Sequence, residues 1–435
     1  MCCWLPACGA SFDHLPTACT RRARFANIKP AEFSSPAPVS PLLLSHFTAT
    51  SCIGHGLAAT LASLRERRSG LRPCDFDTVD LATWIGAVEG VDREVLRADL
   101  AVFDCRNNRL AQLGLRQDGF DNAVQGVAER LGRQRVGVFI GTSTSGILQT
   151  ELAYQRRDPA TGALPADFNY ASTHNTYSVA DFVRRYFGLT GPAAVVSSAC
   201  SSSAKVFASA SRMMAAGLID AAVVGGVDSL CLTTLYGFNS LGLVSSDPCR
   251  PFDIARNGIS IGEAAGFAVL ERVPEHLDSD AVLLLGLGES SDAHHMSSPH
   301  PEGLGARMAM QDALKTAQMQ AGEIDYINLH GTATQNNDAA ETLAVTAVFG
   351  SATPCSSTKG ATGHTLGAAG GVEAVICALA LQHDLLPGGV NTNQPDPALA
   401  LNYLMDNRHQ PVSRVLSNSF GFGGTNCSLI LGRAG

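Results

Sequence analysis

The chain has 435 residues and a net charge of −8, with 45% hydrophobic and only 16% charged side chains. This composition is typical of a folded chain with a large interior and excludes an intrinsically disordered protein. The negative charge disfavours nucleic acid as a partner. No apolar run reaches about 18 residues without a charge or a turn, so we predict no membrane span.

Residues 1–40 differ from the rest of the chain, because they combine four cysteines, a cluster of arginines and a Pro/Ser stretch. A secretory signal needs basic residues before an apolar core, and here neither the order nor the core is present. We therefore predict a disordered tail or a misassigned start. The chain has 13 cysteines and no C-x-x-C pair, which favours free thiols in the cytoplasm over disulfides or a metal site.

From residue 42 onward, apolar strand-like runs alternate with Ala-rich or amphipathic helical runs. This alternation predicts an α/β fold with parallel sheets covered by helices. The predicted strands lie at 135–140, 193–196, 221–224, 266–271, 281–285 and 326–329, with two more around a glycine turn within 415–431. The predicted helices lie at 201–217, 307–318 and 366–381.

A candidate nucleophile lies between a predicted strand and a predicted helix. Cys200 follows the strand 193–196 and opens the helix 201–217. A thiol in this place faces unpaired backbone N–H groups and the positive end of the helix dipole, and both favour the reactive thiolate. Taken alone, the segment is explained equally well as a buried cysteine in a turn of small residues.

Two histidines follow strands or glycine-rich turns in the second half of the chain. His330 ends the strand 326–329, and a loop there can present it to a pocket. His364 lies in a run of Gly, Thr and Ala. A further segment, 418–426, places three glycines around Phe422, so its backbone N–H groups can approach a ligand. Taken singly, His330 is better explained as an ordinary loop histidine. The alternative for 418–426 is a simple hairpin turn, although the two aromatic residues inside it argue mildly against that.

Together these four segments, with the blocks 250–266 and 292–299, resemble the β-ketoacyl synthase family in order and spacing over residues 42–433. The resemblance implies a thiolase-like α/β fold, with five layers αβαβα made of two similar halves. We predict these halves at 41–276 and 277–435. It also implies a dimer, with the active site between the two halves of each subunit.

The combination of Cys200, His330 and His364 is similar to the elongating, Cys-His-His branch of the family, since initiating members carry Asn in the third position. The resemblance implies a decarboxylating condensation in which Cys200 carries the acyl chain. The two histidines then donate hydrogen bonds to the malonyl thioester carbonyl as CO₂ leaves. The backbone N–H groups of Cys200 and Phe422 are expected to hold the oxyanion.

Further roles are implied only by the resemblance. Lys359 and Glu373 are expected to set the charge and orientation around His364. Thr332 and Thr334 are expected to contact the phosphopantetheine arm of an acyl carrier protein. No metal or organic cofactor is expected.

Two predictions concern partners and substrates. Arg106 and Arg109 align with a basic docking run for the carrier protein; a solvated helix face is the alternative. Thr144 stands where fatty-acid elongation enzymes often have a gating Ile, close to Phe238 by resemblance. This exchange predicts a preference for unsaturated, polyenic or aryl-bearing acyl chains.

The sequence leaves the pathway and the subunit arrangement open. Fatty-acid synthesis and type II polyketide synthesis, such as that of aryl-polyene pigments, both fit, as do a homodimer and a heterodimer with a related synthase. One rival is a largely non-catalytic subunit of the chain-length-factor type, but such subunits lack the cysteine that is present here. A cysteine-dependent hydrolase is a more distant alternative.

Overall fold

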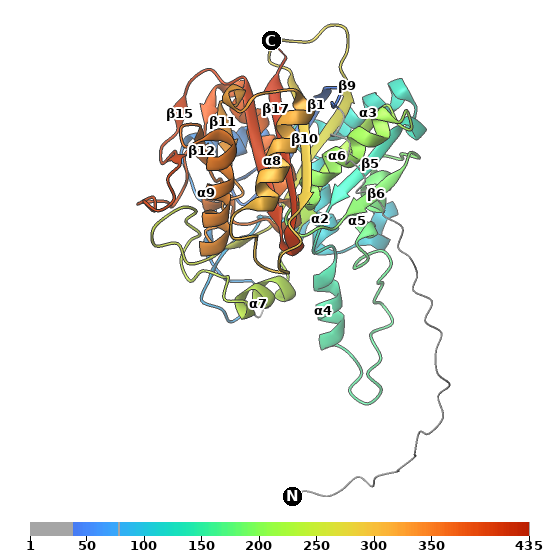
Figure 1. Ribbon diagram of the computed structural model, residues 1–435. Helices are drawn as coiled ribbons and strands as arrows, with labels where there is room; N and C mark the ends of the chain where they lie inside the picture. Colours follow the sequence, from blue (N-terminus) through green and yellow to red (C-terminus); the bar gives the residue numbers. More distant parts are fainter. Residues whose placement is uncertain (1–37, 77–78, 435) are drawn as a thin grey trace, which may run out of the picture. The chain divides into compact units, whose positions relative to one another are not determined.

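The computed structural model describes residues 38–76 and 79–434, so the predictions for residues 1–37 lie outside the described residues. Ten principal strands form two sets of five (Figure 1). The first set is β1 (Leu42–Ser51), β5 (Val136–Gly141), β6 (Ala193–Val196), β7 (Ala221–Asp228) and β9 (Ala264–Arg272). The second set is β10 (Val282–Ser291), β11 (Tyr326–Asn328), β12 (Pro354–Ser356), β16 (Arg414–Gly421) and β17 (Thr425–Arg433).

The two sets have the same topology. Their strand orders are β6-β5-β7-β9-β1 and β12-β11-β16-β17-β10, so each set reads 3-2-4-5-1 when its strands are numbered along the chain. In both sets the first three strands of this order are parallel and the last two run antiparallel to their neighbours. This repeat confirms the thiolase-like fold of two similar halves.

The prediction of parallel sheets does not hold for the strands β1, β9, β10 and β17, which are antiparallel to their neighbours. A three-residue turn, Phe422–Gly424, joins β16 to β17, and so short a connection allows only an antiparallel pair. β1 also joins the two sets, because it pairs with β9 along its length and with β10 at Leu42–Leu44. The two sheets therefore share one hydrogen-bonded path.

Five layers result from the way the helices cover these sheets (Figure 1). Helices α6 (Ser202–Ala215) and α11 (Ala369–His383) pack on each other between the sheets and contact strands of both. The outer face of the first sheet is covered by α2 (Arg106–Leu115), α3 (Phe120–Leu131) and α5 (Tyr177–Tyr186). The outer face of the second sheet is covered by α8 (Leu304–Ala317) and α9 (Gln335–Phe349).

The central position of α11 explains its unusual composition. The stretch Leu366–His383 is long and apolar enough to cross a membrane, with a mean hydropathy of 1.4, but 89% of it is buried inside the fold. A Cβ on Gly370 would lie 2.7 Å from the Cβ of Ala204 in α6, so the small residue is required for the close approach of these helices. The stretch is therefore a core helix covered on all sides.

The remaining elements surround the ends of the strands. α4 (Ile147–Gln155) and α7 (Leu232–Ser240) contact each other and lie below the sheets in the view of Figure 1. The remaining helices are α1 (Gly56–Arg65) and α10 (Lys359–Thr362). The short strands are β2 (Gly54–His55), β3 (Arg72–Pro73), β4 (Trp84–Gly86), β8 (Ile261–Gly262), β13 (Leu385–Leu386), β14 (Asn402–Tyr403) and β15 (Arg408–His409).

Candidate active site

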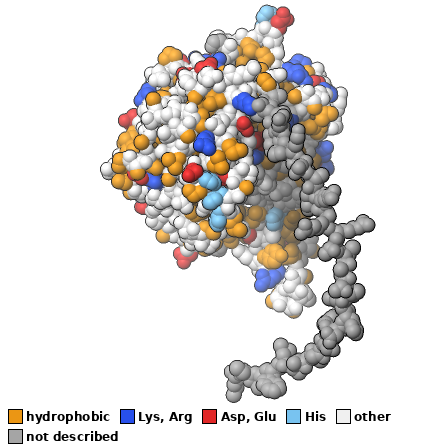
Figure 2. All heavy atoms as spheres, in the orientation of Figure 1, with side chains coloured by type: hydrophobic (Ala, Val, Ile, Leu, Met, Phe, Trp, Pro, Cys, Tyr) orange, Lys and Arg blue, Asp and Glu red, His pale blue; other side chains and the backbone are white. Residues whose placement is uncertain are grey.

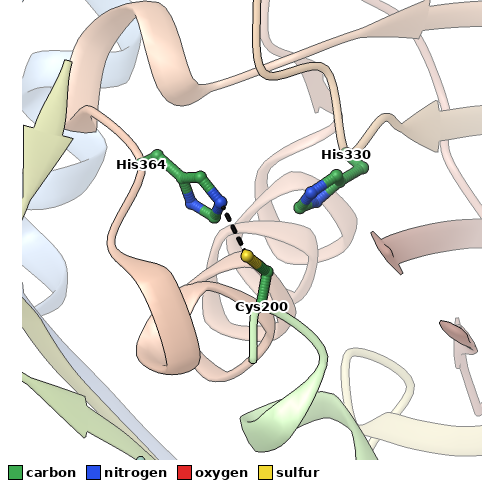
Figure 3. A group of neighbouring side chains, drawn as sticks. All are labelled: Cys200, His330 and His364. Carbon is green, nitrogen blue, oxygen red and sulfur yellow. Dashed lines mark hydrogen bonds between the residues drawn. The ribbon is translucent and has the colours of Figure 1, made fainter. Parts of the chain in front are cut away.

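Three side chains from both halves of the fold meet beyond the carboxyl ends of β6, β11 and β12 (Figure 3). Cys200 follows β6, His330 follows β11, and His364 follows β12 and α10. All three are buried, and their sulfur and ring nitrogen atoms lie within 4.8 Å of one another. The structure thus brings together the three residues predicted to form the catalytic set.

The chain turns sharply just before Cys200. Ala199 has a φ of +53°, which is unfavourable for a residue with a Cβ and is kept only where the surroundings impose it. Hydroxyl groups hold this turn: Ser202 Oγ donates to the carbonyl of Ala199 at 2.6 Å, and Thr425 Oγ1 donates to the carbonyl of Ser198 at 3.0 Å. The turn aims the thiol away from α6 and toward the histidines.

The His364 ring is fixed by two hydrogen bonds. Its Nε2 lies 3.0 Å from Cys200 Sγ, and its Nδ1 accepts the main-chain N–H of Leu366 at 3.3 Å. Burial, followed by the charge of Lys359, holds the pKa of His364 well below its usual range, so the ring is neutral. Because Nδ1 is an acceptor, the single ring proton is on Nε2 and points to the sulfur and the pocket.

His330 is arranged in the same way. The Lys359 ammonium lies 3.4 Å from its Nδ1, so Nδ1 accepts and Nε2 carries the proton. Burial, together with the charges of Lys359 and His364, holds the pKa of His330 well below its usual range. Lys359 also pairs with Glu373, and both are buried. The lysine was predicted to orient His364, but its hydrogen bond goes to His330.

The resting state of Cys200 differs from the thiolate expected from the sequence. Burial raises the pKa of its thiol to about 12, and Asp228 and Glu373 add to this effect. The charge of Lys359 and the backbone N–H of Phe422 oppose the rise without cancelling it. The cysteine precedes the first residue of α6 by two positions and is 5% exposed. Burial therefore outweighs the favourable end of the helix, and the thiol is protonated at rest.

The three atoms are also close enough to suggest a metal site. A metal would need a lone pair on each Nε2, whereas the partners of both Nδ1 atoms place the proton on Nε2. The donor arrangement instead suits an oxygen that gains negative charge between the two imidazoles.

A pocket of about 420 Å³ opens onto the three residues. Thr332 and Thr334 line it, as predicted for contacts with a pantetheine arm, and their hydroxyls lie 3.0 Å apart. Phe238 and Phe422 also line it, with ring centroids 5.4 Å apart. Thr144 is absent from the wall of this pocket.

The position of Thr144 removes the basis of the predicted acyl-chain preference. Its side chain is 1% exposed, and its Oγ1 donates to Asp228 at 2.9 Å while accepting the N–H of Ser229 at 3.1 Å. A threonine can satisfy both bonds, whereas a gating residue must be free to rotate. The structure thus assigns Thr144 to a buried polar cluster in place of a gate.

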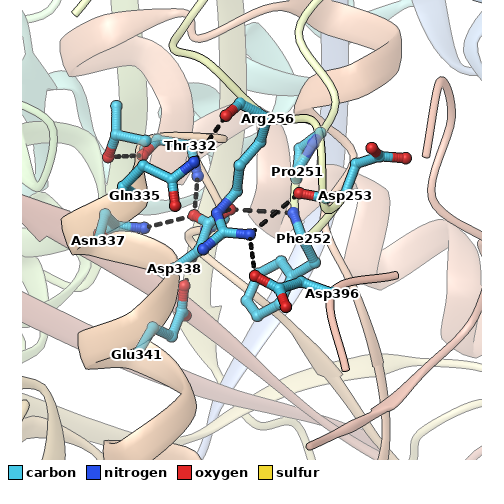
Figure 4. A network of polar contacts seen from close by, with 12 residues as sticks. Pro251, Phe252, Asp253, Arg256, Thr332, Gln335, Asn337, Asp338, Glu341 and Asp396 are labelled. Atoms are coloured by element: carbon cyan, nitrogen blue, oxygen red, sulfur yellow. Dashed lines mark hydrogen bonds and ion pairs between the residues drawn. The ribbon is translucent and has the colours of Figure 1, made fainter. Parts of the chain in front are cut away.

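A polar network supports the pocket wall that carries Thr332 (Figure 4). The carboxylate of Asp338 accepts the N–H groups of Thr332 and Phe252 at 3.1 and 2.9 Å. Arg256 lies 3.7 Å from Asp338 and forms a closer pair with Asp396 at 2.7 Å. All of these groups except Asp396 are buried. The network therefore fixes the backbone of the loop that carries Thr332 at the pocket wall.

Glu341 has the same function one turn further along α9. Its two oxygens accept the N–H groups of His330 and Gly331, each at 2.8 Å. Burial raises the pKa of Glu341 from 4.5 to about 7. Asp338 and Glu341 are three residues apart on the helix that follows His330, and this spacing on one face was a signal in the sequence.

The two arginines predicted to bind a carrier protein lie in different environments. Arg106 is 6% exposed and forms a buried ion pair with Glu263 at 2.7 Å, so it offers no free charge to a partner. The side chain of Arg109 is 28% exposed and pairs with Asp104 through two hydrogen bonds. On the face shown in Figure 2, basic side chains are dispersed among apolar and acidic ones. Any docking role now rests on Arg109.

Comparison with known proteins shows the family. The pattern of the family described as "Beta-ketoacyl synthase, N-terminal domain" matches residues 49–276, and that of "Beta-ketoacyl synthase, C-terminal domain" matches residues 282–393. A solved structure, "Ketosynthase (ApeO) in Complex with its Chain Length Factor (ApeC) from Xenorhabdus doucetiae", is 37% identical with a TM-score of 0.82. It covers 91% of this chain and 98% of that chain.

Two curated relatives show how far the likeness extends. The chain is 38% identical over 262 residues to "3-oxoacyl-[acyl-carrier-protein] synthase, mitochondrial" of Arabidopsis thaliana, and this match spans only 56% of the chain and 57% of the relative. It is 32% identical over 404 residues to "3-oxoacyl-[acyl-carrier-protein] synthase 2" of Vibrio cholerae, a match that spans 88% of the chain and 96% of the relative. The chain therefore belongs to the β-ketoacyl synthase family.

Proposed function

We propose that this protein is an elongating β-ketoacyl-[acyl-carrier-protein] synthase, which joins an acyl group held on Cys200 to a malonyl group held on a carrier protein. The observation that carries the proposal is the pair of neutral imidazoles, His330 and His364, whose Nδ1 atoms are occupied by protein donors. Both Nε2–H groups thus face one pocket beside a buried thiol.

In the first half-reaction the Cys200 sulfur attacks the carbonyl carbon of the acyl thioester. The carbon–sulfur bond to the pantetheine arm breaks, and the cysteine proton leaves with the pantetheine thiol. The backbone N–H of Phe422 already points to Cys200, and with the N–H of Cys200 it is placed to hold the oxyanion. Thr332 and Thr334 line the path by which the arm enters.

In the second half-reaction the malonyl thioester carbonyl accepts hydrogen bonds from both histidines. Loss of CO₂ leaves its electron pair on the α-carbon, and the carbonyl oxygen gains the enolate charge. Two Nε2–H donors stabilise that charge more than the neutral carbonyl, so they lower the barrier. The α-carbon then attacks the acyl-Cys200 thioester, and the released thiolate takes up a proton.

Mass spectrometry of the intact protein tests this proposal. An acyl carrier protein loaded with a fatty acyl chain should add that chain to the wild type, and malonyl carrier protein should then release CO₂ and yield a β-ketoacyl carrier protein. Cys200→Ala should form neither the acyl-enzyme nor the product. Cys200→Gln, which imitates an acylated cysteine, should still release CO₂. Condensation by Cys200→Ala at the wild-type rate would contradict the mechanism.

The site also bears on the rival function of a non-catalytic chain-length subunit. Such a subunit needs neither the thiol nor the two aligned donors, yet all three are in place here. Covalent labelling of Cys200 by cerulenin separates the two functions, because a non-catalytic subunit without a reactive thiol is not labelled.

For partners we propose an acyl carrier protein and a second synthase subunit, identical or related. The apolar strand β6 ends the strand path of the sheet and is only half buried, so its free edge suits pairing with a second subunit. The ApeO ketosynthase, which this chain resembles, was solved with its chain length factor. Light scattering of the purified chain, alone and coexpressed with a related subunit, tests the assignment.

Compartment and cofactors belong to the same proposal. The nine cysteines within residues 38–434 are free thiols, which favours a reducing compartment such as the cytoplasm. One relative is named as mitochondrial, so subcellular fractionation is the decisive measurement. The only prosthetic group that the mechanism requires is the phosphopantetheine of the carrier protein. Fatty-acid synthesis and type II polyketide synthesis both remain candidate pathways for this synthase.

A further inference from the structure

Asp228, the last residue of β7, is fully buried next to the catalytic set. Its carboxylate accepts six hydrogen bonds. The donors are Thr142 Oγ1 at 2.7 Å, Ser143 N at 2.8 Å, Ser143 Oγ, Thr144 N and Oγ1 at 2.9 Å each, and Gly367 N at 2.5 Å.

These donors come from both halves of the fold. Five belong to the turn after β5 in the first half, and the sixth, Gly367, follows His364 by three residues in the second half. Oδ1 accepts the bonds from Thr142 and Thr144 and from the N–H of Ser143. Oδ2 accepts Ser143 Oγ and the N–H of Gly367. Oδ2 is therefore the atom that reaches the His364 segment.

The contact with Gly367 leaves no space for a side chain. A Cβ at this position would lie 2.7 Å from Asp228 Oδ2 and 2.8 Å from Ser143 N. The preceding residue, Leu366, has a φ of +52° although it is not glycine. Such a conformation costs about 1–3 kcal/mol and persists only where neighbours impose it. The N–H of Gly367 is held directly beside it, mainly by Asp228 Oδ2 at 2.5 Å and more weakly by Ser143 Oγ at 3.3 Å.

Leu366 in turn controls the ring of His364. Its N–H donates to His364 Nδ1 at 3.3 Å, and among the described residues no other group forms a hydrogen bond with this nitrogen. Without this donor, Nδ1 is free to hold the proton, and Nε2 then loses the N–H that the enolate requires.

We propose that Asp228 is a positioning residue for His364: by holding Gly367 it fixes the N–H of Leu366 on Nδ1, and so keeps the His364 proton on Nε2. This inference rests on the proposed function of His364 as an enolate donor. It places one determinant of the second half-reaction in the first half of the chain, although Asp228 touches neither the pocket nor the ring.

Two variants break the contact from opposite sides. In Asp228→Asn the amide oxygen can keep the four bonds of Oδ1, while the amide NH₂ replaces Oδ2 and faces the N–H of Gly367. Gly367→Ala keeps the carboxylate and inserts a Cβ into the contact. Asp325→Asn is the matched control, because Asp325 also accepts two backbone N–H groups, of Ser413 and Arg414, at the opposite end of β16 from the site.

The main measurement is CO₂ release from malonyl carrier protein by the Cys200→Gln enzyme with and without each variant. We expect Asp228→Asn and Gly367→Ala to lower kcat about 10- to 100-fold, the range for partners that orient a functional imidazole. KM should change little, because neither side chain lines the pocket. Asp325→Asn should match its parent.

Two further readouts distinguish positioning from general damage. ¹⁵N-histidine spectra, assigned with His364→Ala, should show His364 as the Nε2–H tautomer in the parent and a mixture in both variants. In enzymes that keep Cys200, alkylation of this residue by iodoacetamide at neutral pH should become faster in Asp228→Asn, because the Asp228 charge raises the pKa of that thiol. It should be unchanged in Gly367→Ala. A disordered site would lose decarboxylation without these selective changes.

The inference is overturned if Asp228→Asn and Gly367→Ala both keep the decarboxylation rate of the Cys200→Gln parent and the Nε2–H tautomer of His364. It is also overturned if Asp325→Asn loses as much decarboxylation as they do. If the parent releases no CO₂ at all, the proposed function fails, whereas the spectra still report whether Asp228 controls the tautomer.

Discussion

The buried pair Lys359–Glu373 allows stability and catalysis to be separated by mutation. Lys359 is 1% exposed, pairs with Glu373 and lies 3.4 Å from His330 Nδ1. Lys359→Met removes the cation and leaves a buried carboxylate without its partner, which should lower the free energy of unfolding by about 3–5 kcal/mol. The double variant Lys359→Met/Glu373→Gln removes both charges, so most of that loss should be recovered.

Catalysis should not recover with stability. In both variants His330 Nδ1 lacks its donor, so Nε2 no longer has to carry the proton, and CO₂ release should fall by about 10- to 100-fold. Urea unfolding and CO₂ release from malonyl carrier protein, measured on the same preparations, give the two quantities. A double variant that regains the wild-type decarboxylation rate would refute the assignment of Lys359 as the residue that orients His330.

Removing either enolate donor, by His330→Ala or His364→Ala, should slow decarboxylation by about 10²–10³-fold and acylation of Cys200 much less; equal loss of both half-reactions would contradict this division. The pKa of the Glu341 carboxyl is about 7 in the folded protein and 4.5 in the unfolded chain. Between these pH values the folded protein therefore keeps a proton that the unfolded chain releases, and the free energy of unfolding should decrease by about 3 kcal/mol as the pH rises from 4.5 to 7. In Glu341→Gln the free energy of unfolding, measured by urea titration at each pH, should decrease less with pH. An unchanged dependence on pH would show that another group is responsible. Arg109→Glu should weaken carrier-protein binding in calorimetry, and the loss should be larger at low salt than at high salt. The control Arg130→Glu should bind the carrier protein like the wild type, and Arg109→Glu should still react normally with small thioesters.

The sequence was sufficient for the strands that precede Cys200 and His330 and for the helices that follow Cys200 and His364, because each is an apolar or Ala-rich run next to a marked motif. It did not predict β12 and α10, the short elements that precede His364. The predicted strand 193–196 is β6, and the predicted helix 366–381 lies within η5 (Leu366–Ala368) and α11. The sequence was less informative about whether neighbouring strands are parallel or antiparallel, because the pairing of β1 with both β9 and β10 depends on residues more than 200 positions apart.

The errors at the site share one physical cause. Arg106 and Thr144 were predicted to act because of their positions along the chain, but each is buried against a carboxylate, Glu263 or Asp228. Burial depends on the whole fold and is not visible in a local motif. The same holds for Cys200, where the helix end is a local property and the desolvation that raises the thiol pKa is not.

The repeated topology explains why the site needs both halves. In each half the third strand leads into a central helix, and the two central helices α6 and α11 pack against each other. This brings the segments that follow β6 and β12 together at Cys200 and His364, so the first half contributes the thiol and the second half contributes both imidazoles. In the proposed reaction neither half can condense alone, because Cys200, which would carry the acyl group, and the two histidines, which would donate to the enolate, arise from different copies of the same supersecondary unit. Contacts that cross between the halves, such as Asp228 to Gly367 at 2.5 Å, therefore join the thiol-bearing half to the segment that carries His364.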